Sequence, residues 1–129
     1  MKRIVSFEKV TLRESGMRGS SEYETVMTED GAEVSLYRIR YNGSEEERVL
    51  ELRAVCGVED ALALLNGCKI MSWDGFDGPH PRGVLDGIMF RFEAAVNGGE
   101  KITARGSQNF PRHYREFRDG LYSILHGGE

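Results

Sequence analysis

The sequence has few cysteines, prolines and tryptophans: two, three and one among 129 residues. Two thiols cannot build the dense disulfide framework of a small secreted domain, so we expect Cys56 and Cys68 to be reduced. Glu8 and Lys9 interrupt the apolar stretch at the N-terminus before a signal peptide could form. Together these features predict a cytoplasmic protein.

Long hydrophobic runs are also missing. The longest, residues 61–65, is far below the roughly 18 to 20 apolar residues that a membrane-spanning helix requires, so we expect no membrane partner. The formal net charge of -4 disfavours a polyanion, because nucleic-acid affinity comes mostly from neutralised phosphates. We therefore expect no nucleic-acid partner, and any basic surface must be local.

Sequence motifs that fix a reaction are absent as well: there is no Walker A pattern, no GxGxxG and no GxSxG. We therefore expect no cofactor. The composition, 40% apolar and 29% charged, is ordinary for a globular protein, and 129 residues suit one hydrophobic core. We predict a single domain that covers residues 1–129.

Runs of β-branched and aromatic residues, separated by turn signals such as Asn42-Gly43, predict strands joined by hairpins. The expected strands are residues 3–12, 23–28, 33–41, 48–55, 88–96 and 101–105. Residues 13–22 are rich in Gly and Ser and show no periodicity, so we expect a flexible connection there.

Two segments with helical spacing of apolar residues complete the prediction. One begins at Val58, with Glu59 and Asp60 in the first turn, where acidic side chains favour the helix dipole. The other begins at Pro111 and ends before Gly127. The order β-β-β-β-α-β-β-α predicts an α+β fold with a mainly antiparallel sheet and two helices on one face.

One segment stands apart, Trp73–Gly87, with the sequence WDGFDGPHPRGVLDG. It holds four of the 16 glycines, two of the three prolines and the only tryptophan. A loop of this length in a compact domain is usually either functional or mobile. A catalytic interpretation uses Asp74, His80 and Asp86 as acid/base groups of a small hydrolase-like or lyase-like enzyme.

The alternative interpretation treats the same loop as a series of turns. Each Asp-Gly pair can form a turn in which the aspartate bonds its own backbone, and Trp73 and Phe76 can fix the loop by burying their rings. We prefer this interpretation because turn chemistry accounts for every residue of the loop. A function located there would then be recognition rather than reaction.

A metal site is not expected. The aspartates Asp74, Asp77 and Asp86 lie at gaps of three and nine residues, which do not match the alternating oxygen ligands of a calcium loop. The possible zinc ligands lack paired short spacings. They are Cys56, Cys68, His80 and His113.

The C-terminal part of the chain is locally basic. Its basic residues are Lys101, Arg105, Arg112, Arg115 and Arg118. We take Arg105, Arg112 and Arg115, together with Trp73, as candidate ligand-binding residues, because guanidinium groups bind carboxylates and phosphates in a planar fork. The alternative is a solvated helix face balanced by the acidic residues 45–47.

Several short motifs lie in the C-terminal half: WDGF at 73–76, GVLDG at 83–87, Asn97-Gly98, ITARGS at 102–107 and NFP at 109–111. In this pattern the chain resembles an uncharacterised bacterial family whose domain has no known function. The resemblance covers Trp73 to about Leu125. It implies a shared fold module, and it implies no activity and no functional residue.

These observations predict a non-enzymatic module that binds a protein partner or a small anionic ligand, or that forms a homodimer through an exposed edge of the sheet. The alternative is a small acid/base enzyme that uses the carboxylates of Trp73–Gly87, with Arg105 or Arg112 binding an anionic substrate.

Overall fold

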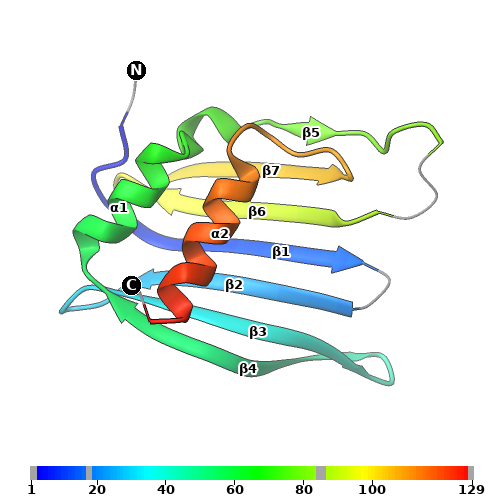
Figure 1. The fold of residues 1–129 in the computed structure, drawn as a ribbon, viewed down its shortest axis with the longest axis horizontal. Coiled ribbons are helices and arrows are strands. Elements are labelled where there is room, and N and C mark those ends of the chain that lie inside the picture. Colours follow the sequence, from blue (N-terminus) through cyan, green and yellow to red (C-terminus); the bar gives the residue numbers. More distant parts are fainter. Residues whose placement is uncertain (1–2, 17–18, 84–86, 128–129) are drawn as a thin grey trace.

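The computed structural model describes residues 3–16, 19–83 and 87–127. Within these ranges the chain forms one seven-stranded sheet with the order β4-β3-β2-β1-β6-β7-β5. Two α-helices lie across the same face of this sheet (Figure 1). The predicted α+β class and the mainly antiparallel sheet are therefore confirmed.

The elements follow each other in a simple sequence. They are β1 (Phe7–Gly16), β2 (Gly19–Met27), β3 (Ala32–Asn42), β4 (Glu45–Cys56), α1 (Val58–Gly67), η1 (Ile70–Trp73), β5 (Asp77–Gly78), β6 (Met89–Val96), β7 (Glu100–Ser107) and α2 (Tyr114–Leu125). The predicted order lacked η1 and β5. Both lie within or next to the Trp73–Gly87 loop, and β5 pairs in parallel with β7 at Arg105 and Gly106.

The prediction of a flexible connection over residues 13–22 is wrong for residues 13–16 and 19–22, whereas residues 17 and 18 lie outside the described residues. Strands β1 and β2 pair in an antiparallel ladder that continues to Gly16 opposite Gly19. The ladder is stabilised by polar cross-strand pairs: Arg13 lies opposite Glu22, and the Ser20 hydroxyl donates to the Ser15 hydroxyl at 3.0 Å. Apolar periodicity marks the strands only up to residue 12 and from residue 23, because the ends that face each other across the turn carry polar side chains.

The C-terminal helix begins three residues later than Pro111 suggested. Pro111 accepts a hydrogen bond from the Tyr114 amide at 3.3 Å, and His113 adopts a left-handed conformation with φ 67° before the helix starts. Of the turns, Asn42-Gly43 and Asn97-Gly98 do join consecutive strands, and each glycine has the positive φ that such turns require.

The hydrophobic core lies between the sheet and the helices. Trp73 is completely buried there, with ring centroids 5.0 Å from Phe92, 5.9 Å from Tyr114 and 5.6 Å from Phe117. Its indole N–H donates to the Arg112 carbonyl at 2.9 Å. Trp73 therefore joins η1, the sheet and the start of α2, which confirms that its ring is buried.

A carboxylate also lies on this helix-covered face. Glu14 of β1 accepts a hydrogen bond from the Tyr114 hydroxyl and another from Arg118 at 3.4 Å. Burial, together with the bond to Glu14, raises the pKa of Tyr114 far above its ordinary value, so the phenol stays protonated and donates. This polar contact ties α2 to the middle of the sheet.

The opposite face of the sheet, which we call the open face, carries no helix among the described residues (Figure 1). Its side chains are mostly charged and form a network of ion pairs. Arg48 lies 2.7 Å from Glu22 and 3.2 Å from Glu24, and Lys9 also lies 3.2 Å from Glu24. The open face therefore contains ion pairs between charged side chains, whereas the helix-covered face contains packed aromatic side chains.

Candidate anion-binding site

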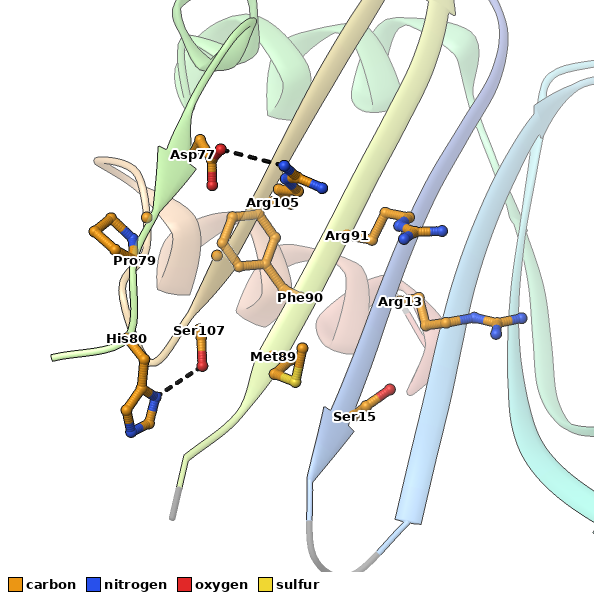
Figure 2. Close-up of a pocket in the computed structure, with 12 residues that line it drawn as sticks. Arg13, Ser15, Asp77, Pro79, His80, Met89, Phe90, Arg91, Arg105 and Ser107 are labelled. Carbon is orange, nitrogen blue, oxygen red and sulfur yellow. Dashed lines mark hydrogen bonds and ion pairs between the residues drawn. The ribbon is translucent and has the colours of Figure 1, made fainter. Parts of the chain in front are cut away.

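A pocket of about 530 Å³ lies on the open face, between β1 and the segment that follows β5 (Figure 2). Its base is formed by the ends of β6 and β7. The residues that line it are Arg13, Ser15, Asp77, Gly78, Pro79, His80, Met89, Phe90, Arg91, Arg105, Gly106 and Ser107.

Three arginines of the pocket come from three neighbouring strands. Arg13 of β1 lies directly opposite Arg91 of β6, and Arg91 lies directly opposite Arg105 of β7. We call these three residues the arginine row. Like charges placed opposite each other destabilise a sheet, so this row has an electrostatic cost unless negative groups offset it.

The two outer arginines have acidic partners. Arg13 lies 3.0 Å from Glu22 and 2.9 Å from Glu46, and these hydrogen bonds hold the pKa of Arg13 above its ordinary value. Arg105 has a weaker contact, 3.4 Å to Asp77, and the two side chains are 69% and 63% exposed. A long contact between exposed groups compensates little charge.

The central arginine has no such partner. The Arg91 side chain makes no hydrogen bond and no ion pair with any residue in the part of the chain that the structure describes, and the residues opposite it on both neighbouring strands are arginines. Its side chain is exposed on the open face and lies at the pocket (Figure 2). The guanidinium of Arg91 is thus available to a group from outside the protein.

The far wall of the pocket is held by a serine and a histidine. The Ser107 hydroxyl lies 2.8 Å from His80 Nδ1, which joins the end of β7 to the segment after β5 (Figure 2). Asn109 supports the same wall from behind, where its side-chain amide donates to the Pro79 carbonyl at 3.3 Å. These contacts place hydroxyl and imidazole groups at the rim, on the side opposite Arg13.

The shape of the pocket depends on two glycines. A Cβ atom on Gly106 would lie 2.1 Å from the Asn109 carbonyl oxygen and 2.7 Å from the Phe90 ring. A Cβ atom on Gly78 would lie 2.8 Å from the side chain of Asn109. Only glycine allows β5, β7 and the Asn109 segment to approach this closely.

The structure separates the residues that the sequence grouped as an acid/base site. The Asp74 carboxylate accepts a hydrogen bond from the Thr103 amide at 3.0 Å, and Asp74 does not line the pocket. His80 does line it, whereas Asp86 lies outside the described residues. The interpretation of the loop as Asp-Gly turns is wrong in part: Gly75 has the positive φ of a turn, but the Asp74 carboxylate bonds a neighbouring strand and not its own backbone, and Asp77-Gly78 form strand β5.

The structure does not bring the four candidate ligand-binding residues together. Arg105 belongs to the pocket, whereas Trp73 is buried in the core on the other side of the sheet. Arg112 and Arg115 are exposed at the start of α2, away from the open face. Arg118 of the same basic segment bonds Glu14 of β1, whereas Glu46, one of the acidic residues 45–47 expected to balance this segment, pairs with Arg13.

Arg13, Arg91 and Ser107 are the pocket residues that sequence reasoning missed. Arg91 lies at an outward position of β6, between the inward-facing Phe90 and Phe92. That alternation was visible in β6. The register that brings the three arginines side by side was not, because it depends on how β1 pairs with β6 across a sequence separation of about 80 residues.

No family model matches this chain, and no curated protein matches it. Across the described residues, no three His, Cys, Asp or Glu side chains are grouped so that they could hold a metal ion. None of the helices in the same ranges is long and apolar enough to cross a membrane.

Proposed function

We propose that the protein is a non-enzymatic binding module that takes a small anionic ligand on the open face, at the arginine row. The observation that carries this proposal is Arg91, a guanidinium without a partner among the described residues, placed between two other arginines. A bound carboxylate or phosphate would offset the repulsion along the row. The volume of about 530 Å³ suits a small molecule.

The chemistry of the row favours a planar or tetrahedral oxyanion. A guanidinium group donates two parallel hydrogen bonds to a carboxylate or a phosphate, and Arg91 and Arg105 stand on adjacent strands. Their Cα atoms are therefore roughly 5 Å apart, close enough for both side chains to reach one ligand. His80 and Ser107 supply further polar groups at the opposite rim.

The acid/base enzyme has less support. Its three proposed groups were Asp74, His80 and Asp86, and the first of these already accepts a backbone hydrogen bond outside the pocket. A role in the cytoplasm stays part of the proposal. It is supported by the two free thiols, Cys56 and Cys68, which suit a reducing compartment.

Calorimetric titration with citrate and with inorganic phosphate, each against sodium chloride at equal ionic strength, tests the proposal. We expect at least one of the two anions to bind, and Arg91→Ala to weaken that binding by roughly tenfold or more, since a hydrogen bond to a charged group contributes about 1.5–3 kcal/mol. The matched control is Arg115→Ala, an exposed arginine on α2. Equal affinities for wild type and Arg91→Ala, or no binding by either anion, would refute the proposal.

A further inference from the structure

The two edges of the sheet differ in how far their backbone hydrogen-bonding groups are covered. At the β7 edge the backbone is covered by the chain that leads into β5: the Thr103 amide donates to Asp74, the Gly75 amide donates to the Thr103 carbonyl at 2.9 Å, and the Arg105 amide donates to the Phe76 carbonyl at 3.0 Å. The loop residues 74–76 therefore use the hydrogen-bonding groups of this edge.

The β4 edge has no such cover. Strand β4 is twelve residues long and stands at the end of the strand order, paired only with β3 among the described residues (Figure 1). Every second backbone group along this strand points away from β3 and can pair with another strand. An uncovered edge of this length is a template for strand addition.

The side chains of β4 protect this edge only in part. The strand contains no lysine and no proline, although half of its twelve residues are charged and its register with β3 shifts between Leu36 and Tyr37. Beside these charges it exposes large apolar side chains, with Leu50 45% and Val55 65% exposed. These side chains would lose contact with water if a second strand lay beside β4.

The charges on β4 select the direction of that second strand. Residues 45–47 are all glutamate, Arg48 follows them, and Arg53 stands toward the other end of the strand. In an antiparallel pair with Leu50 opposite Leu50 of the other copy, Glu47 of each copy lies beside Arg53 of the other, and the two Arg48 side chains stay apart. A parallel pair would place the glutamates against each other, which is destabilising.

We propose that β4 pairs antiparallel with β4 of a second copy of this chain, so that two sheets join into one across a twofold axis. Such an interface is self-complementary, as a symmetric dimer requires. It uses the edge and not the pocket. Its failure would therefore leave the proposed anion-binding function unaffected, and the reverse also holds.

Sedimentation equilibrium of the full chain tests the dimer. We expect wild type to have twice the 14.5 kDa mass of one chain at concentrations of tens of micromolar, and the double variant Leu50→Lys with Val55→Lys to sediment as a monomer. The control is Val5→Lys, which adds the same charge at a site that is 68% exposed away from β4 and keeps the dimer. A monomeric wild type, or a double variant that stays dimeric, would overturn the proposal.

A cross-linking variant keeps the test decisive if the lysine variant folds poorly. Leu50→Cys in a Cys56→Ser background places a thiol near the middle of β4, where two antiparallel copies bring equivalent residues close together. We expect mild oxidation to give a covalent dimer. The control is Val5→Cys in the same background, which stays uncross-linked. Equal cross-linking by both variants, or none by Leu50→Cys, contradicts the pairing.

Discussion

The two faces of the sheet differ in their side chains: alternate residues of the same strand face the hydrophobic core on one side and the solvent on the other. On the face beneath the helices, β6 presents Phe90, Phe92 and Ala94. Phe92 packs against Trp73 and Phe117, and Phe90 packs against Tyr114. That face contains few charges, and Glu14, which lies there, has two donors.

On the open face the intervening residues of the same strand are Met89, Arg91 and Glu93, all exposed. Ion pairs compensate part of the charge there, and neither Arg91 nor Glu93 has an ion-pair partner among the described residues. The helix-covered face is thus optimised for stability, whereas the open face keeps an uncompensated charge. A ligand would therefore act on the open face, and substitutions on the two faces should differ in their effect on stability.

The largest effect is expected on the helix-covered face. Trp73→Ala should lower the free energy of unfolding by about 3–5 kcal/mol, because it removes a buried ring that contacts three others and leaves a cavity. Urea denaturation followed by circular dichroism measures it. Tyr122→Ala, a half-exposed ring on α2, is the control and should cost under about 1 kcal/mol. Similar losses for the two variants would show that Trp73 does not join the layers.

A smaller effect should come from the buried polar contact on the same face. Tyr114→Phe removes one of the two donors of Glu14 and should cost about 1–3 kcal/mol, since the carboxylate remains shielded from water. Urea denaturation of Tyr114→Phe, of Glu14→Gln and of the double variant separates the loss of the hydrogen bond from the cost of an unpaired carboxylate. If the loss comes from the unpaired carboxylate, Glu14→Gln combined with Tyr114→Phe will cost less than the sum of the two single changes. Additive losses would show that the two groups are not coupled.

The fold could be predicted from sequence wherever apolar periodicity marked an element, as it did for α1 and for the hairpin of β6 and β7. The prediction failed for residues 13–16 and 19–22, where Arg13 and Glu22 stabilise the ladder through charge. The site was harder to predict because its arginines lie in separate strands, and only the register brings Arg13 and Arg91 together. The loop residues that attracted attention, such as Asp74, serve largely to close the β7 edge.

Acid should weaken the open face through its paired carboxylates. Burial by itself would raise the pKa of Glu24, but its bonds to Lys9 and Arg48 together outweigh burial and lower it below 4.5. A lowered pKa means that this stabilisation is fully present above pH 4.5 and is lost as the pH falls through the value in the folded protein.

Thermal melts between pH 6 and pH 3 measure this loss. We expect Glu24→Gln to reduce stability at pH 6 by up to about 1 kcal/mol, as for other exposed ion pairs, and to reduce the acid-dependent loss. The difference between wild type and variant should shrink toward pH 3. A difference that is constant across this range would show that the ion pairs of Glu24 contribute no stability.

The smallest effect has the opposite sign. Without a ligand, Arg91→Ala should leave stability unchanged or raise it by up to about 0.5 kcal/mol, because it relieves the repulsion from Arg13 and Arg105 on the neighbouring strands. Urea denaturation at low and high salt measures it, and the gain should shrink as salt screens the charges. Arg115→Ala is the control, with no gain at either salt concentration. If Arg91→Ala instead destabilised the protein at low salt, Arg91 would have a favourable partner in the folded chain, and the contrast between the two faces would lose its basis.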